Sequence, residues 1–226
     1  ICDDGKPGTT LDTCDGAGAC IGVKPPETDE LFVETFDDGD YTQAPAGVLS
    51  ESCNAGSCGE MTASVLTPAS ATSPVLSVKR ENAPADSGAL VVRYNNVQAM
   101  VPGSATAVIL KYRVRILNDQ LNWGGGGCTE WTARIGVKVN LLDSTTRNLS
   151  SIHNTGTKNC TASDDKVWVY QQLTLNEWTN VEVDITAELG SAGITSPISN
   201  VDFLEVGSNG WNFEAEFDDI RVEYVQ

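Results

Sequence analysis

Strict alternation of apolar and polar residues over two long segments constrains the fold of this chain more than any other feature. In residues 106–117, TAVILKYRVRIL, apolar and mostly basic positions follow one another, and residues 131–142, WTARIGVKVNLL, show the same pattern. Successive side chains of a β-strand point to opposite faces of its sheet. Both segments are therefore predicted to be strands with one buried face and one polar face.

Further strands complete an all-β fold. They are predicted at residues 31–36, 74–80, 88–96, 166–175, 177–186, 200–208 and 212–225. Residues 187–193 offer at most one helical turn, and the Gly-, Ser- and Thr-rich stretches 37–73 and 143–165 are expected to be long loops. About ten strands separated by polar turns predict an antiparallel β-sandwich, and their length fits a jelly roll better than an immunoglobulin domain.

The first thirty residues differ from the rest. Residues 1–22 are largely Gly, Asp, Thr and Cys without a hydrophobic period, so they cannot bury a core and would need disulfides to hold a shape. Residues 23–30, VKPPETDE, combine prolines and acids as extended linkers do. The sequence thus predicts a cysteine-rich arm over 1–22, a linker over 23–30 and a β-sandwich domain over 31–226.

The charge balance excludes several partners. The chain carries 14 Lys and Arg against 31 Asp and Glu, a net charge of −17. Such a surface repels phosphate backbones and anionic lipid, and no apolar run reaches the ~18 residues of a membrane helix. We therefore expect neither nucleic-acid binding nor membrane insertion.

The seven cysteines lack paired C-x-x-C spacing, which favours disulfides over a zinc site. Disulfides in turn favour a secreted or cell-surface location. Cys53 and Cys58 enclose a short loop, which predicts a local bridge. Cys128 and Cys160 lie in the two loops that flank the strand 131–142 and its successor, which predicts a second bridge. The arm holds the other three, namely Cys2, Cys14 and Cys20. The odd count leaves at least one thiol free or bonded to another chain.

Catalytic chemistry is not expected. The one histidine, His153, lies in the polar stretch SSIHNTGTKN, which is typical of a solvated loop. A Ser-His-Asp triad would depend wholly on this residue. A glycosidase needs two carboxylates on opposite sides of one bond, and no pair stands out among the acids. The chain is therefore interpreted as a non-enzyme.

Two parts of the chain resemble known families. The pieces FVETFDDGD, LKYRVRI, IGVKVNLLDS, LTLNEWTNVEVDIT, FLEVGSNG and FDDIRVEY, in this order, resemble jelly-roll carbohydrate-binding modules and related galactose-binding-like sandwiches over 31–226. The arm resembles a cysteine-rich repeat of large secreted proteins, with Gly8 near the place of a fourth cysteine. The usual pairing of that repeat therefore cannot be carried over whole.

The first resemblance implies a structural calcium ion. In such modules the first and last strands of the sandwich lie side by side and hold Ca²⁺, which takes six to eight oxygen ligands. Here a DDGD turn follows the first strand and a DD pair lies in the last one. The implied carboxylate ligands are Asp37, Asp38, Asp40, Asp218 and Asp219. The alternative is a solvated acidic turn in an acidic protein.

Two groups of residues are candidates for glycan binding. Trp123 precedes a run of four glycines that would let a sugar approach its ring, whereas Trp131 is expected to face the core. Tyr41, Trp168 and Trp211 are further possibilities, although such residues more often lie in a core or at its rim. Five basic residues occupy the polar faces of the two alternating strands, and they are Lys111, Arg113, Arg115, Arg134 and Lys138. Either Glu182 and Asp184, which alternate with apolar residues, neutralise them, or they form a face that binds acidic sugars, because arginine holds carboxylates with two hydrogen bonds.

Two functions remain open at this stage. The first is an extracellular, calcium-stabilised module that binds a polysaccharide or a cell-surface glycan, or acts in adhesion. The second is a structural subunit of an extracellular filament or surface layer, in which residues 1–30 add to a neighbouring copy. The sequence also contains the glycosylation patterns Asn148-Leu149-Ser150 and Asn159-Cys160-Thr161.

Overall fold

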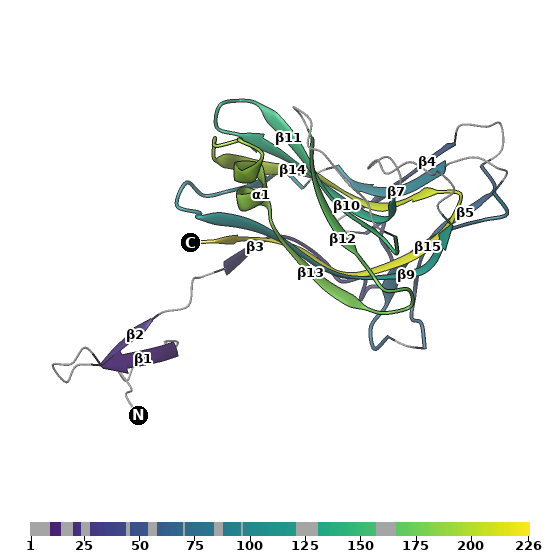
Figure 1. The fold of residues 1–226 in the computed structure, drawn as a ribbon, viewed down its shortest axis with the longest axis horizontal. Coiled ribbons are helices and arrows are strands. Elements are labelled where there is room, and N and C mark those ends of the chain that lie inside the picture. Colours follow the sequence, from purple (N-terminus) through teal and green to yellow (C-terminus); the bar gives the residue numbers. More distant parts are fainter. Residues whose placement is uncertain are drawn as a thin grey trace.

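Two large β-sheets pack face to face around one hydrophobic core in the computed structural model of the chain (Figure 1). The structure describes residues 28–43, 46–53, 58–69, 71–83, 88–95, 97–120, 131–156 and 166–226, and the backbone of 10–14 and 20–23. The antiparallel β-sandwich predicted from the sequence is confirmed.

The first sheet has seven strands in the order β12-β11-β10-β14-β7-β4, with β8 paired to β14. These strands are β12 (Lys166–Gln172), β11 (Thr146–Asn154), β10 (Trp131–Leu141), β14 (Ile198–Gly210), β7 (Gly88–Tyr94), β4 (Val48–Cys53) and β8 (Ala99–Met100). All pairings in this sheet are antiparallel except that of β11 with β12, which is parallel.

The second sheet has six strands in the order β13-β9-β15-β6-β5, with β3 paired to β15. These strands are β13 (Thr179–Asp184), β9 (Ala107–Gln120), β15 (Asn212–Val225), β6 (Val75–Glu81), β5 (Glu60–Leu66) and β3 (Thr28–Glu34). The helix α1 (Ile185–Ser191) follows β13, and Asp184 caps it by accepting a hydrogen bond from the backbone N–H of Ala187. No helix in the described part of the chain is long and apolar enough to cross a membrane.

The alternating segments supply the centre of the core. Leu110, Tyr112 and Val114 of β9 are buried against Ile135 and Val137 of β10, as the period of two predicts. The polar positions between them point away from the core, so each sheet has an outer face that carries the charged side chains.

Three strands lie where loops were expected, and the loop predictions for 37–73 and 143–165 are wrong there. β4 and β5 are edge strands with many exposed polar residues, so they lack a clear alternation. β11 is buried along most of its length although it is rich in Ser and Asn. Its polar side chains are accommodated because they find hydrogen-bond partners inside the sandwich.

The arm contains a two-stranded sheet of its own, formed by β1 (Thr10–Cys14) and β2 (Cys20–Val23). Cys14 and Cys20 are backbone partners in its register. β3 begins at Thr28, inside the stretch predicted as a linker, and Thr28 to Glu30 pair with Val225 to Glu223 of β15. The sandwich thus starts three residues before Leu31.

Candidate functional site

The basic residues do not form one stripe, because β9 and β10 belong to different sheets. Arg134 and Lys138 lie on the outer face of the seven-stranded sheet, whereas those of β9 lie on the outer face of the other sheet. The prediction of a single basic face is therefore wrong. Alternation places a side chain on a face of its strand, but it does not reveal that the chain crosses between sheets after residue 120.

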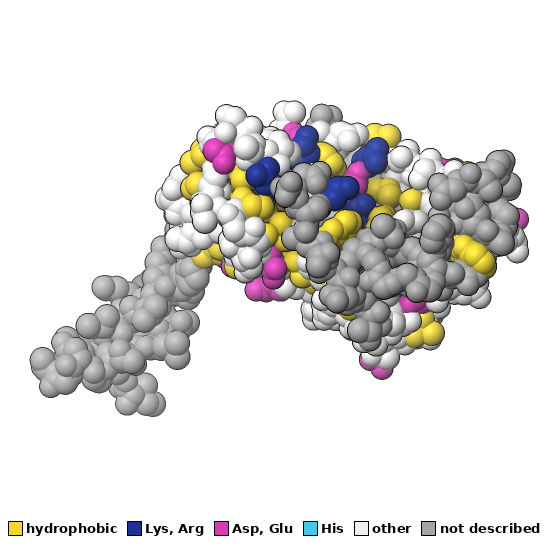
Figure 2. Space-filling model, turned by 45° about the horizontal axis from the view of Figure 1, so that its top comes forward, with side chains coloured by type: hydrophobic (Ala, Val, Ile, Leu, Met, Phe, Trp, Pro, Cys, Tyr) yellow, Lys and Arg dark blue, Asp and Glu magenta, His cyan; other side chains and the backbone are white. Residues whose placement is uncertain are grey.

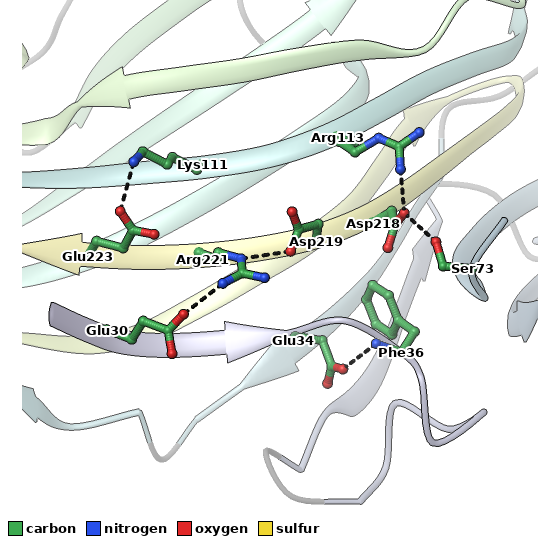
Figure 3. Close-up of polar contacts among 10 residues, drawn as sticks. All are labelled: Glu30, Glu34, Phe36, Ser73, Lys111, Arg113, Asp218, Asp219, Arg221 and Glu223. Carbon is green, nitrogen blue, oxygen red and sulfur yellow. Dashed lines mark hydrogen bonds and ion pairs between the residues drawn. The ribbon is translucent and has the colours of Figure 1, made fainter. Parts of the chain in front are cut away.

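The basic residues of β9 are paired with acids of the neighbouring strand β15. Lys111 Nζ lies 2.8 Å from a carboxylate oxygen of Glu223, and Arg113 Nη1 lies 3.1 Å from Asp218 Oδ2 (Figure 3). Arg115 pairs in the same way with Glu216. The hydrogen bond to Glu223 raises the pKa of Lys111. The basic residues of this face are therefore paired, as one interpretation predicts, but their partners are acids of β15, whereas the prediction named Glu182 and Asp184.

Three of the predicted calcium ligands lie together, one after the first strand of the sandwich and two in the last strand. Asp37, Asp218 and Asp219 line a hollow of ≈ 240 Å³ together with Arg113 and Arg221. Asp218 is almost fully buried, and its Oδ2 accepts hydrogen bonds from Ser73 Oγ at 2.9 Å and from Arg113 (Figure 3). Burial is the main reason that the pKa of Asp218 is raised.

Asp219, Asp38 and Asp40 also accept hydrogen bonds from neighbouring groups. Asp219 Oδ1 accepts from Arg221 Nε at 2.7 Å. Asp38 accepts the backbone N–H of Asp40 at 3.0 Å. Asp40 in turn accepts both the backbone N–H and the hydroxyl of Thr42 at 2.8 Å. The pKa of Asp40 is lowered mainly by these bonds from Thr42.

As they lie, these residues do not fit a calcium ion. Two guanidinium groups share the hollow with the carboxylates, and they supply the positive charge that a metal would bring. Within the described residues, no group of three or more His, Cys, Asp or Glu side chains could hold a metal ion. The predicted calcium binding is untested, and the ion pairs of this hollow lead us to expect no change in stability on chelation.

The outer face of the seven-stranded sheet has a different character. Cross-strand partners share a face, and two rows of partners cross this sheet. One row runs through Trp168, Ser150, Gly136 and Glu205, and the next runs through Lys166, Asn148, Lys138 and Phe203. Between β12 and β14 the centre of the first row therefore carries only small side chains.

This arrangement produces a hollow of ≈ 220 Å³, which we call the groove. Its outward lining residues are Arg134, Gly136, Asn148, Ser150, Lys166, Trp168, Phe203 and Glu205. Trp168 and Phe203 are both partly exposed and lie on opposite sides of the small floor residues. Three strand spacings separate β12 from β14, which makes the groove ~14 Å across.

Arg134 lies across the floor of the groove. Its Nη2 lies 2.6 Å from Glu205 Oε2, and its guanidinium carbon lies 4.8 Å from the centre of the Trp131 ring. A Cβ atom at Gly136 would come within 2.5 Å of Arg134 Nη2, so only glycine leaves room for the guanidinium in this position. Burial lowers the pKa of Arg134.

Trp131 does not face the main core, and the expectation that it does is wrong. A register irregularity between Trp131 and Arg134 breaks the alternation at the start of β10. Trp131 therefore packs with Val91 and Ile152 in a second, smaller cluster, against which Trp168 rests. This cluster supports the aromatic wall of the groove from below.

His153 is fully buried, so its interpretation as a solvated loop residue is also wrong. It lies in β11 and forms a hydrogen bond with the hydroxyl of Tyr112, while its Nδ1 lies 3.1 Å from the carbonyl oxygen of Gln171. Burial lowers the pKa of His153 to about 4. The side chain is thus neutral and structural, and it lies in the interior, away from the groove.

Some predicted positions lie outside the described residues, namely Trp123, Cys128, Cys160 and Cys2. Of the predicted bridges, Cys53–Cys58 is confirmed, with sulfur atoms 2.08 Å apart.

Sequence reasoning missed Phe203 and Glu205, and it gave Trp168 only as a further possibility beside Tyr41 and Trp211. The segment KVWVY at 166–170 does alternate, with Trp168 and Tyr170 on one face. That signal could have identified two aromatic residues on an outer face. Nothing local indicates that Phe203 and Glu205 lie opposite Trp168, because this depends on the order of strands in the sheet.

Comparisons with known proteins find similarity among solved structures, but not among family models or curated proteins. No family model matches the sequence. A search of curated proteins also finds no match. Among solved structures, it is similar to the family 11 carbohydrate-binding module of a cellulosomal cellulase of Clostridium thermocellum, at 8% identity and a TM-score of 0.37, over 86% of this chain and 95% of that one.

Two further similar structures come from glycan-active proteins. A family 30 carbohydrate-binding module of another cellulosomal cellulase of Clostridium thermocellum aligns at 12% identity and a TM-score of 0.40, over 78% of this chain and 90% of that one. A β-1,2-glucanase from Parabacteroides distasonis aligns at 14% identity and a TM-score of 0.43, over 88% of this chain and 25% of that one. All three TM-scores lie below 0.5, so these similarities carry no conclusion about what this chain does.

Proposed function

We propose that this chain is a non-catalytic extracellular module that binds a glycan in the groove of its seven-stranded sheet. The observation that carries the proposal is the placement of Trp168 and Phe203 on either side of a floor of small side chains. Aromatic rings offer flat apolar surfaces for the C–H faces of sugars, and polar groups beside them can bond the hydroxyl groups. The groove provides both.

The polar lining suits a sugar ligand. Asn148 and Ser150 present amide and hydroxyl groups on the floor, and Arg134 and Glu205 are held in place by their mutual ion pair. Because these side chains are fixed before a ligand arrives, little conformational entropy is lost on binding.

The same lining supports a binding role and not a catalytic one. Glycoside hydrolysis uses two carboxyl groups across the scissile bond. Among the described residues that line the groove, Glu205 is the one carboxylate, and both of its oxygens bond guanidinium groups, one of Arg93 and one of Arg134. Incubation with a bound polysaccharide should therefore release no reducing sugar.

The disulfide supports an extracellular location. The Cys53–Cys58 bridge would be reduced in most cytosolic compartments, whereas it persists in an oxidising one. This supports a secreted or cell-surface module.

Truncation of the aromatic wall tests the proposal. Trp168→Ala should weaken binding to a soluble polysaccharide by about tenfold, measured by affinity electrophoresis over a panel of plant and algal glycans. Trp178→Ala is the matched control, because Trp178 stacks on Arg113 and Arg115 on the opposite outer face. Equal binding by both variants, or no binding of any glycan by the native protein, would exclude the groove as a glycan site.

The arm supports a second candidate, self-assembly into an extracellular filament or layer. β1 and β2 pair with each other, and among the described strands they pair with none of either large sheet. A free two-stranded unit could add to the sheet of a neighbouring copy. Loss of filaments on deleting the arm, with the groove variants still assembling, would favour this role.

A further inference from the structure

The groove has an unbalanced set of charges. Glu205 receives Arg93 Nε at 2.6 Å on one oxygen and Arg134 Nη2 at 2.6 Å on the other. One carboxylate thus serves two guanidinium groups. On the opposite outer face, Lys111, Arg113 and Arg115 each have a carboxylate of their own.

Lys166 adds to this imbalance. It lines the groove and is exposed, and it has no ion-pair partner among the residues that the structure describes. The neighbouring Lys138 is neutralised, because its Nζ lies 2.6 Å from Asp202. Among the described residues in and beside the groove, the three cations Arg93, Arg134 and Lys166 therefore stand against one carboxylate, Glu205. Figure 2, which brings the top of Figure 1 forward, shows Lys and Arg side chains gathered among hydrophobic ones.

The placement of the cations relative to Trp168 is specific. The guanidinium of Arg134 lies over Gly136, which belongs to the same cross-strand row as Trp168. Lys166 lies two residues from Trp168 along β12 and so points to the same side of the sheet. A sugar ring stacked on Trp168 would thus have a guanidinium across the floor and an ammonium group one row further on.

From this geometry we infer that the groove selects polysaccharides whose sugars carry carboxylate groups, that is, polyuronates. The inference rests on the proposed glycan-binding function and specifies its ligand class. Arginine binds carboxylates through paired, charge-assisted hydrogen bonds, and a second carboxylate would complete the shared pair of Arg93 and Arg134. The aromatic wall would bind the apolar face of the same sugar.

The overall charge of the chain distinguishes specific binding of a polyuronate from nonspecific adsorption. The chain carries a net charge of −17, so its long-range field repels a polyanion. Any attraction to a polyuronate must therefore come from a local positive site. Such binding should weaken as salt screens the ion pairs, whereas binding to a neutral glucan should not.

The test compares ligands that share one backbone. Polygalacturonate and its fully methyl-esterified form have the same sugar backbone, and esterification replaces each charged carboxylate by a neutral methyl ester. In calorimetric titrations with EGTA present, we expect at least tenfold tighter binding of the free acid, and a loss of that preference at high salt. A mixed-linkage β-glucan and a sulfated galactan serve as neutral and sulfated comparisons.

Variants then test which basic residues are responsible for the preference for the free acid. Lys166→Gln and Arg93→Gln should each reduce the preference for the free acid over the esterified form severalfold. Both side chains are largely exposed at their ends, so folding is expected to survive, as a melting curve would verify. Lys79→Gln, on the six-stranded sheet, is the matched control.

The outcomes separate the two proposals. Equal affinity for the acid and the ester, or an unchanged preference in both groove variants, overturns the polyuronate inference while glycan binding stands. A preference for the sulfated galactan over polygalacturonate also overturns it, because the site would then recognise a different anion. If no glycan binds, the proposed function itself fails and the inference fails with it.

Discussion

Tyr112 of β9 and His153 of β11 are hydrogen-bonded in the core, so a pair of polar side chains joins the two sheets of the sandwich. The carbonyl oxygen of Gln171 can only accept, so His153 Nδ1 carries the proton and Nε2 accepts from the Tyr112 hydroxyl. Ser151 Oγ lies 2.7 Å from the same hydroxyl. This arrangement requires a neutral imidazole.

Acid should destabilise the fold through His153. Its pKa is about 4 in the folded protein and about 6.5 in the unfolded chain, so the unfolded chain binds one more proton between these values. The stability contributed is fully present above pH ~6.5 and is lost progressively as the pH falls toward 4, by about 3 kcal/mol in total. The chain has one histidine, so a proton NMR titration of its imidazole reports on this residue alone. A midpoint near 6.5 in the folded protein would contradict the prediction.

Chelation should leave the melting temperature unchanged. Arg113 and Arg221 already neutralise the negative charges of Asp218 and Asp219, so these carboxylates need no metal ion. Arg113→Ala should instead lower the stability by about 2 kcal/mol, because it leaves the buried carboxylate of Asp218 without its charged partner. Lys79→Ala is the control, because it removes a cation of the same sheet whose partner Glu81 is exposed and does not become a buried, unpaired charge. A clear fall in melting temperature with EGTA would restore the calcium interpretation.

Two glycines of the seven-stranded sheet should respond differently to substitution by alanine. At Gly207 a Cβ atom would lie 2.3 Å from the carbonyl oxygen of Leu90, a backbone atom that cannot move aside, so Gly207→Ala should strongly destabilise the fold. At Gly136 the obstacle is the mobile end of Arg134. Gly136→Ala should therefore fold, but should displace the guanidinium from the groove and weaken glycan binding. Equal melting temperatures for the two variants would argue against this account.

Some of this structure could be read from the sequence because the cause is local. The alternation around Tyr112 fixes a strand and its buried face, and the loop between Cys53 and Cys58 is short enough to bridge. Other features depend on contacts between distant residues. Arg113 and Arg134 look equivalent along the chain, yet strand order places them on opposite faces of the molecule.

Contacts between distant residues also explain the wrong predictions for His153 and for the end of the linker. A polar stretch is normally a loop, and β11 becomes a buried strand only because Tyr112 and Gln171 provide partners for its histidine. Likewise Thr28 to Glu30 have no apolar pattern, and they form a strand because β15 offers an edge to pair with. No local signal in these segments shows which partners they will find.

Deletion of the arm should separate its role from that of the sandwich. Removing residues 1–27 leaves all of β3 in place, so the melting temperature should stay close to that of the full chain. Removing residues 1–34 also deletes β3 with the buried ring of Phe32 and the ion pair of Glu30 with Arg221, and should cost at least ~2 kcal/mol.

The shorter deletion is the informative one for function, because it changes the arm and spares the sandwich. Glycan binding in the groove should persist, because Trp168 lies in β12, which belongs to the seven-stranded sheet, whereas β3 belongs to the six-stranded one. Sedimentation velocity and electron microscopy of the same variant then report on assembly. If the 1–27 deletion unfolds the protein, the boundary at Thr28 is wrong. If it folds and binds but no longer assembles, the arm is the assembly element and the groove is an independent site.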